Sequence, residues 1–346
     1  MANKTQRKMS ASLKSLLAFL ALLAVTILIF SQLHDQFFSQ RNFNMLLKHM
    51  SITAIVALGL TFVIIVGHFD MSFYLVGNLA AMSAAFVVSL DITMDSFTIG
   101  GIHSMVILAV IIGIVVGTAW GVISGVAVGV FKLDDMVTTI GTGSIAFGLA
   151  YLYSNGSFIY KNFLMSGILE VNDDKWFGLP FPVILMFLTY ILAYLILNKS
   201  IYGRNFYATG ANKVAAIFSG VKVKKYIIIA FAASSGLTSL AAIIATASRG
   251  QGSVTVSSNF LMPAYVALYI GIAIFKKATV LGTFLGTLLV TILGNGFVLL
   301  NVPYYWGDLI IAFTLVGSII LSRTDLSKLF KKKQGMATAS SVEVTQ

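Results

Sequence analysis

Cysteine is absent from the 346 residues of this chain. Its absence excludes disulfides, thiolate chemistry and cysteine-ligated zinc or iron–sulfur sites. The chain has four histidines, and their spacing matches no metal motif; they are His34, His49, His68 and His103. A GxxxxGK[ST] loop, which would cradle nucleotide phosphates, is also missing. We therefore expect no metal site, no catalytic site and no nucleotide-binding site in this chain.

Charge is scarce as well, because Asp, Glu, Lys and Arg make up only 10% of the residues. In contrast, 58% of the residues are hydrophobic and the mean hydropathy is +0.93, outside the range of soluble domains. A helix needs about 20 residues to cross a bilayer, so the chain can hold about ten spans and no separate soluble domain. The spans are expected at residues 15–33, 46–66, 73–90, 104–131, 136–153, 180–197, 226–247, 261–275, 279–300 and 304–321. The predicted fold class is all-α, a polytopic membrane protein.

Some of these spans depart from a simple helix. The second and third are separated only by the segment GHFDMS, and the eighth is short. Non-helical backbone at membrane depth is tolerated only where protein buries it or where it lines a cavity. We therefore expect broken or re-entrant helices at both places. The first apolar run lacks a small-x-small cleavage site, so we interpret it as a retained helix and not as a signal peptide.

The basic residues predict the orientation, because loops that face the cytoplasm collect Lys and Arg. Ten spans with a cytoplasmic N-terminus place all but five of the 23 Lys and Arg inside; the five are Arg41, Lys48, Lys161, Lys175 and Arg249. The net charge of +11 is then a topology signal and does not indicate nucleic-acid binding. We expect a cytoplasmic N-terminal segment at 1–14, one transmembrane domain at 15–322, and a partly disordered cytoplasmic tail at 323–346.

One span carries a glycine every four residues, which leaves one helix face without side chains. These glycines are Gly113, Gly117, Gly121, Gly125 and Gly129, and Gly282 and Gly286 repeat the pattern near the ninth span. Faces of small residues allow close backbone approach between helices in lipid. We expect another helix to pack against this face; a glycine-lined permeation path is the alternative.

Ionisable residues inside a membrane usually mark ion-coupled transport, and they are nearly missing here. Only Asp70 and Asp308 come close to membrane depth, and a proton relay needs a chain of such groups. Asp70 and Ser72 are expected to cap the helix that begins at Phe73, since Asp and Ser favour that position. A contact between Asp70 and substrate is the alternative. Any ATP-driven transport would need a separate ATPase subunit.

The longest polar and basic interruption between two spans is YGRNFYATGANKVAAIFSGVKVKK, residues 202–225 within an inside loop at 199–225. Gly203, Gly210 and Gly220 are expected to break it. The segment ANKVAAIFS is expected to form a short helix that exposes the small residues Ala215, Ala216 and Ser219. Such a helix outside the membrane is suited to docking into the groove of a partner.

This stretch resembles the coupling segment of the permease subunits of ABC importers for ribose and related sugars, including the autoinducer-2 importers. The resemblance to this family covers residues 43–323 of the chain. The family's coupling segment has the form GR-x-x-Y-A-x-G-x-N-x-x-A-A-x-x-SG-[IV]-x-V. The residues that match it, and that the resemblance assigns to the ATPase contact, are Gly203, Arg204, Tyr207, Gly210, Asn212, Ala215, Ala216, Ser219 and Gly220.

A second motif, TFVIIVGHFDMSFYLVGNLAAMSAA, is similar to the family's GG-[IF]-DLS-x-G-x segment. Gly67, Asp70 and Ser72 match it, and the resemblance places them in a broken helix near the pathway. His68 stands where the family usually has glycine. A third segment also departs, because LYIGIAIFKKATVLG replaces a glycine-rich pattern with Tyr269, Ile270, Phe275 and Lys276. This departure leaves the solute open and suggests pairing with a more typical second permease.

The resemblance implies an importer that works by alternating access in the bacterial cytoplasmic membrane. Its partners would be two ATP-binding subunits, which carry ATP and Mg²⁺, an extracytoplasmic sugar-binding protein, and a second permease copy as a homodimer or heterodimer. This chain itself would bind no cofactor and would be no enzyme. An ion-coupled secondary transporter of a small polar solute is the alternative function. A membrane enzyme is disfavoured because the chain has no paired carboxylates or nucleophile–base arrangement.

Overall fold

The computed structural model describes residues 2–90, 98–99, 102–163, 168–169, 175–176 and 178–323. These residues are almost wholly helical, which confirms the predicted all-α class. The strands in this part form two small antiparallel ladders, β1 (Thr98–Ile99) with β2 (Ile102–His103) and β3 (Lys175–Trp176) with β4 (Leu179–Pro180). The tail predicted at residues 323–346 lies outside the described residues after residue 323.

Each of the ten predicted spans corresponds to one helix in the described part. In chain order the helices are α1 (Ala2–Leu33), α2 (Gln40–Ile65), α3 (Phe73–Ser89), α4 (Ser104–Gly129), α5 (Asp135–Leu152), α7 (Phe181–Tyr194), α10 (Val223–Arg249), α11 (Leu261–Phe275), α12 (Val280–Leu299) and α13 (Tyr304–Arg323). Seven helical stretches of the described chain are long and apolar enough to cross a membrane, and α3 and α13 add shorter apolar helices. The structure is therefore that of a polytopic membrane protein.

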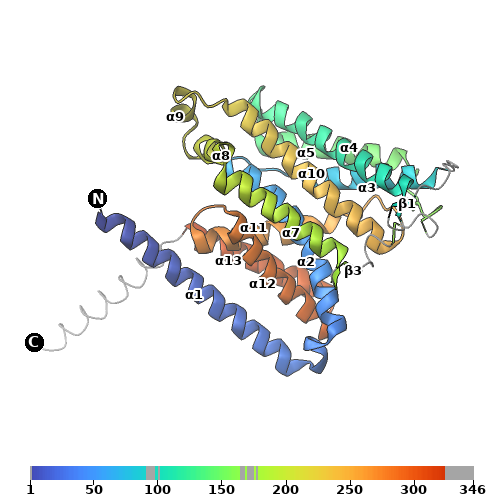
Figure 1. Ribbon diagram of the computed structural model, residues 1–346, viewed down its shortest axis with the longest axis horizontal. Helices are drawn as coiled ribbons and strands as arrows, with labels where there is room; N and C mark the ends of the chain where they lie inside the picture. The colour runs from blue at the N-terminus through green and yellow to red at the C-terminus, as the bar shows by residue number, and fades with distance from the viewer. Residues whose placement is uncertain are drawn as a thin grey trace, which may run out of the picture.

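Shorter elements join these helices. A 3-10 turn, η1 (Asp35–Phe38), links α1 to α2, and a π-helical turn, η2 (Leu195–Lys199), continues α7. Two short helices, α8 (Ile201–Ala211) and α9 (Lys213–Phe218), follow it and lie at one end of the bundle (Figure 1). A last 3-10 turn, η3 (Ser258–Phe260), precedes α11. Helix α1 runs without a break from residue 2 through the first span.

Helix α10 lies at the centre of the bundle and packs on α2, α3 and α4. In Figure 1 it runs alongside α4. Helices α11, α12 and α13 form a second group that packs on α2, and α1 contacts α11 and α12. Only 17% of the apolar, membrane-spanning stretch of α1, within residues 15–33, is buried inside the protein. Its outer surface is therefore available to lipid.

The glycine face of α4 lies against α10 over its whole length. A Cβ added at Gly117 would stand 1.7 Å from the Ser239 hydroxyl, and one at Gly121 would stand 2.5 Å from the Phe231 carbonyl oxygen. Gly125 and Gly129 meet Ile228 and Ile227 in the same way, and Gly113 meets α3 and α10 together. The two backbones approach so closely that no side chain fits between them.

A second close approach joins α11 to α12. A Cβ at Gly286 would stand 1.9 Å from the Ala267 carbonyl oxygen, and one at Gly271 would stand 2.4 Å from the Gly282 carbonyl carbon. These helices end and begin at the segment that departs from the family pattern. Lys276 ends α11 in the left-handed conformation, with φ +57°, which glycine usually adopts at this position.

Non-helical backbone occurs at both predicted breaks, and it includes the buried residues Asp70, Ser72 and Ser257. Residues 66–72 separate α2 from α3, and Gly67 has φ +80°. Ahead of α11, the buried Ser257 donates its backbone N–H to the Asn78 side-chain oxygen at 2.9 Å and its hydroxyl to the Tyr74 carbonyl at 2.7 Å. Side chains therefore satisfy backbone groups that lipid would leave unpaired.

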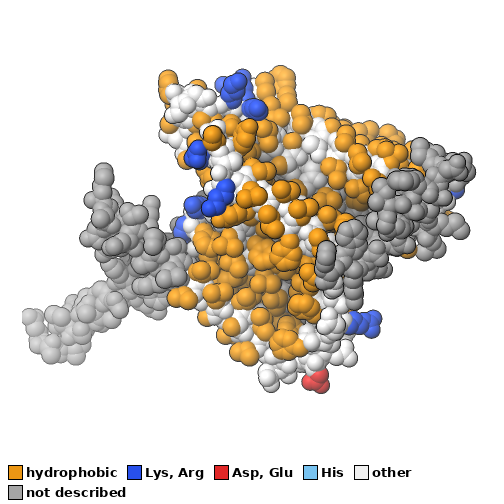
Figure 2. Space-filling view, viewed as in Figure 1, with side chains coloured by type: hydrophobic (Ala, Val, Ile, Leu, Met, Phe, Trp, Pro, Cys, Tyr) orange, Lys and Arg blue, Asp and Glu red, His pale blue; other side chains and the backbone are white. Residues whose placement is uncertain are grey.

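The surface has an apolar belt with basic residues at one end. Figure 2 shows hydrophobic side chains over most of the visible face, and Lys and Arg gathered where α8 and α9 lie. Members of this basic end include Arg204, Lys213, Lys222, Lys224 and Lys225, which lie on α8, on α9 and at the start of α10. We refer to this end of the bundle as the basic end.

Candidate functional site

Helix α8 packs closely on η2 and on the end of α2 through its glycines. A Cβ added at Gly203 would stand 2.0 Å from the Leu197 carbonyl oxygen, and one at Gly210 would stand 1.9 Å from the Ile65 carbonyl oxygen. The prediction that these two glycines break the segment is wrong, because both lie inside α8 without positive φ. They are glycines because the backbone of α8 touches the last residues of η2 and α2.

Two side chains of α8 add hydrogen bonds to other helix ends. Asn205 donates to the Tyr226 hydroxyl on α10 at 2.7 Å, and the Tyr207 hydroxyl donates to the Ala278 carbonyl between α11 and α12 at 3.1 Å. Burial raises the pKa of the Tyr207 phenol, which keeps its proton for this bond. Lys277 lies over the Tyr207 ring, 5.8 Å from its centroid. At the basic end of the bundle, helix α8 thus contacts η2 after α7, the start of α10, the turn after α11 and the end of α2.

Residues that match the family's coupling-segment pattern stand at both ends of helix α9. Asn212 caps it by accepting from the Ala215 backbone N–H at 3.0 Å. Gly220 ends the following turn with φ +80°, in open space. Ala216 is buried, whereas Arg204 and Ser219 are exposed. The predicted short helix is therefore present in the structure.

The exposed surface of α9 differs from the predicted one. Ala216 faces the protein, and the solvent-facing side chains include Val214, Ile217 and Phe218, which are 63%, 60% and 88% exposed. The prediction that small residues form the docking face is therefore wrong for Ala216. The spacing i, i+3, i+4 of these apolar residues could have revealed the face, because it is the amphipathic pattern of a helix. We call Val214, Ile217 and Phe218 the α9 apolar face.

Asp70 lies in the turn between α2 and α3 and is fully buried. Its Oδ1 accepts from the Ser72 backbone N–H at 2.8 Å and from the Ser72 hydroxyl at 2.6 Å, and its Oδ2 accepts from the Ser234 hydroxyl on α10 at 2.9 Å. The backbone carbonyl of Asp70 accepts from the Tyr265 hydroxyl on α11. Asp70 therefore holds the start of α3 against α10 and α11. The Ser72 hydroxyl does not cap α3, which corrects its predicted role.

The same turn is held on its other side by α5. The Phe69 backbone N–H donates to Asp135 Oδ2 at 3.1 Å, and the Met71 backbone N–H donates to the Thr139 hydroxyl at 3.0 Å. Asp134 caps α5, since it accepts from the backbone N–H groups of residues 136 and 137. Alternate residues of the turn thus bind α5 on one side and α10 and α11 on the other.

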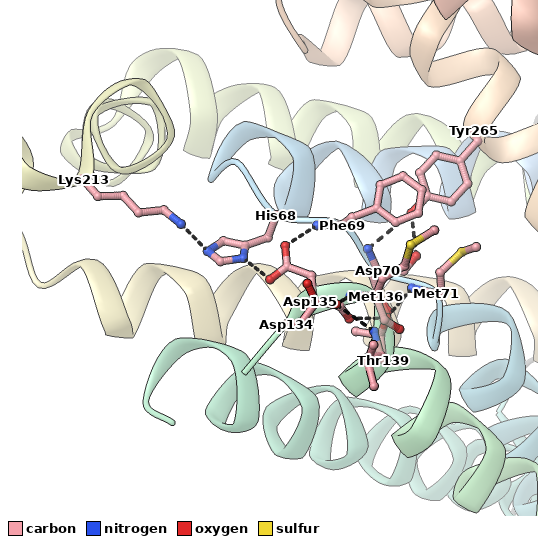
Figure 3. A network of polar contacts seen from close by, with 11 residues as sticks. His68, Phe69, Asp70, Met71, Asp134, Asp135, Met136, Thr139, Lys213 and Tyr265 are labelled. Atoms are coloured by element: carbon pink, nitrogen blue, oxygen red, sulfur yellow. Dashed lines mark hydrogen bonds and ion pairs between the residues drawn. The ribbon is translucent and has the colours of Figure 1, made fainter. Parts of the chain in front are cut away.

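His68 connects this turn to the motif helix α9. Its Nδ1 lies 2.7 Å from Asp135 Oδ1, and its Nε2 lies 2.9 Å from the Lys213 ammonium (Figure 3). These residues border an open pocket at the basic end, which Gly67 and Met136 also line. Sequence reasoning placed neither Lys213 nor Asp135 in the site, because they are 145 and 67 residues from His68.

The described residues include no group of three His, Asp or Glu side chains that could hold a metal ion. The carboxylate of Asp70 is occupied by hydrogen bonds from the protein itself. The side chain of Asp308, the other acid predicted near membrane depth, lies outside the described part of the chain. The geometry is thus that of a packed helical bundle with a short, largely exposed helix, α9, at its basic end.

Comparison with known proteins agrees with this reading. A family model described as the branched-chain amino acid transport system / permease component matches residues 42–319. The ribose import permease protein of Escherichia coli (strain K12) is 30% identical, over 89% of this chain and 92% of that protein. The ribose import permease protein of Bacillus subtilis (strain 168) is 29% identical, over 87% and 90%. The autoinducer 2 import system permease protein of Photorhabdus luminescens is 29% identical, over 87% and 88%.

No solved structure matches this chain. The matched region covers the described helices from α2, except its first two residues, to α12 and most of α13. The relatives are permeases, so the chain is a membrane permease and not an enzyme. With its apolar helices, it is a multi-pass protein of the bacterial cytoplasmic membrane. The chain belongs to the family of the branched-chain amino acid transport system / permease component.

Proposed function

We propose that this chain is the permease subunit of an ATP-driven ABC importer that carries a sugar or sugar-like solute into the cytoplasm. The observation that carries this proposal is the α9 apolar face. Val214, Ile217 and Phe218 are exposed at the basic end, where the positive-inside rule predicts contact with the cytoplasm and not with lipid. An exposed apolar cluster among polar residues is typical of a protein-binding surface.

The anchoring of α8 supports a mechanical role for this surface. A partner that moves α9 also moves α8, and α8 touches α2, α7, α10 and the turn between α11 and α12. Rigid-body displacement of helices about packed contacts is a common form of alternating access. Binding and hydrolysis of ATP on a partner subunit would supply the work, with ATP and Mg²⁺ bound there and not to this chain.

The partners follow from the same proposal. Two ATP-binding subunits would dock at the basic end, a second permease copy would complete the pathway, and an extracytoplasmic binding protein would deliver the solute. A further relative, 27% identical over 90% of this chain and 91% of that protein, is the D-allose transport system permease protein of Escherichia coli (strain K12). The names of the relatives support ribose, allose or autoinducer-2 as solutes to be tested first. The segment at residues 268–282, with Lys276 and its departure from the family pattern, is a reason to test all three.

An ion-coupled secondary transporter is the alternative. It would need an ionisable group that exchanges an ion during transport. In the described part of the chain, the one carboxylate buried without any exposure is Asp70, and three donors from the protein already occupy it. This arrangement favours the ATP-driven importer.

The test is to purify the tagged permease from its native membrane in mild detergent and to identify the proteins that accompany it. An ABC-type ATPase in near-stoichiometric amount, and uptake in proteoliposomes that requires ATP, is the expected result. A permease that carries no ATPase and transports under a sodium or proton gradient alone would overturn the proposal. The solute is then identified by measuring uptake of radiolabelled ribose, allose and autoinducer-2 in the reconstituted complex.

A further inference from the structure

The chain Lys213–His68–Asp135 joins α9 to α5 and to the turn between α2 and α3 (Figure 3). A lysine ammonium can only donate hydrogen bonds, so His68 Nε2 is the acceptor. The proton of the neutral ring is then on Nδ1, which donates to Asp135 Oδ1. The imidazole thus lies between a cation and an anion, with its donor facing the carboxylate and its acceptor facing the ammonium.

Asp135 connects His68 to the backbone of the turn between α2 and α3. One of its oxygens accepts from His68, and the other accepts from the Phe69 backbone N–H. Asp70, the next residue, is fully buried and bound to α3, α10 and α11. The His68 side chain is only 9% exposed and that of Asp135 27%, so water screens this contact less than it screens a surface ion pair.

This contact is a separate route from α9 into the bundle. In the described part of the chain, no other hydrogen bond joins a side chain of α9 to α2, α3 or α5. The contacts of α8 reach α2 and α7 through backbone, and reach α10 and the turn after α11 through side chains. A displacement of α9 therefore reaches the Asp70 turn through His68 without passing along α8.

We propose that His68 is a positioning residue that transmits displacement of α9 to the turn between α2 and α3. The inference rests on the proposed function, because it assigns a path to the motion that a docked ATPase imposes. Lys213, next to the α9 apolar face, is the point where the motion enters, and Asp135 is the point where it leaves. The hydrogen bonds, and not the volume of the ring, carry the effect.

The experiment compares His68→Leu with His68→Gln in the reconstituted complex with its ATPase. Leucine fills similar space without hydrogen bonds, whereas glutamine keeps one acceptor and one donor. For His68→Leu we expect solute uptake per ATP hydrolysed to fall about fivefold, the scale of single-residue effects on coupling, while the ATPase still co-purifies. For His68→Gln we expect most of the wild-type ratio. Equal ratios for His68→Leu and wild type, or equal losses in both variants, would overturn the inference.

A second variant keeps the test decisive if His68→Leu does not fold. Lys213 is exposed, so Lys213→Met removes the ammonium without disturbing the core, and it should lower the same ratio. Lys224→Met removes the same charge from an exposed position of the basic end that does not contact His68, and it should leave the ratio unchanged. The double variant His68→Leu with Lys213→Met should lose no more than either single variant, because both act on one contact.

Failure of the proposed function is separable from failure of this inference. If wild-type permease carries no ATPase, the proposed function fails before any variant is made. If wild type is coupled and the Lys213→Met variant keeps the wild-type ratio, the contact between Lys213 and His68 does not transmit the motion and only this inference fails.

Discussion

The α4–α10 interface and the α8–α9 segment both depend on glycine, but the glycines have opposite surroundings. On α4, five glycines face the side chains and backbone of α10 over more than four turns, and Gly113 also meets α3. On α8, Gly203 and Gly210 each face one carbonyl at the end of a different helix. The first arrangement makes one continuous packed interface, which we call the α4–α10 wall, and the second makes separate point contacts. Glycine spacing alone does not distinguish these two arrangements, because they differ in the residues that the glycines contact.

The two regions also differ in polarity. The α4–α10 wall buries Ser235, whose hydroxyl has no partner among the described residues, and it contains no charge. The α8–α9 segment is held by Asn205, Tyr207 and the charged contact of Lys213. Contacts between polar groups at a helix end can break and re-form, whereas interlocked backbones cannot separate without exposing close-packed surface. Motion is therefore expected at the basic end and not along α4.

The largest effect on stability is expected from a substitution that disrupts the α4–α10 wall. Gly121→Leu would drive a side chain into the Phe231 carbonyl, 2.5 Å from its Cβ position. Overpacking of this kind costs about 1–3 kcal/mol or more, and here it forces two long helices apart. We expect loss of monodisperse protein in detergent and a lowered Tm. Gly141→Leu on α5 is the control, since nothing lies within 4 Å of its Cβ position, and a lowered Tm there would contradict the argument.

A smaller effect on folding, but a large effect on transport, is expected at the contact between α8 and the end of α2. Gly210→Val places a Cβ against the Ile65 carbonyl and pushes α8 away from α2. We expect the variant to insert and to bind the ATPase, and to lose most of its ATP-dependent uptake. Gly220→Ala is the comparison, because its position is open and its only cost is the φ of +80°. Wild-type uptake by Gly210→Val would show that α8 does not transmit force to α2.

The α9 apolar face can be tested without affecting either glycine contact. Phe218 is 88% exposed, so Phe218→Asp should leave Tm unchanged. If Phe218 is an anchor of the ATPase interface, the dissociation constant should rise about 30-fold, equivalent to about 2 kcal/mol. Because the chain has no cysteine, Phe218→Cys gives one labelling site. Its reaction with a maleimide should be fast in free permease and slow in the complex, and equal rates would place the interface elsewhere.

The smallest effect is expected at the end of α11, which belongs to neither region although α8 contacts the turn that follows it. Lys276 has φ +57° at the end of α11, a conformation that costs a non-glycine residue about 1 kcal/mol. Lys276→Gly should raise Tm by about 1–3 °C, since part of the gain is offset by the greater freedom of glycine in the unfolded chain. Lys132→Gly, with the same φ after α4, should behave alike. A fall in Tm in both variants would mean that contacts of the lysine side chains outweigh the strain.

Much of the architecture could be predicted from local sequence. Spans, their order and the break at residues 66–72 follow from hydropathy and from two polar stretches, because the cost of placing a residue in lipid is nearly a property of that residue. The capping Asn212 and the turn glycine Gly220 are also local signals. The predictions that were wrong concern neighbours: Gly210 was expected at a helix boundary, and α9 was expected to expose Ala216.

What the sequence by itself determined is therefore the class of protein, the positions of its spans, its family and the presence of the short helix α9. Only the tertiary structure decided which carbonyl each glycine meets, which face of α9 is exposed, and that His68 joins Lys213 to Asp135. The physical reason is separation along the chain: Asp70 binds Ser234, 164 residues away, and Lys213 binds His68, 145 residues away. Such pairings depend on how helices pack, which no local pattern encodes.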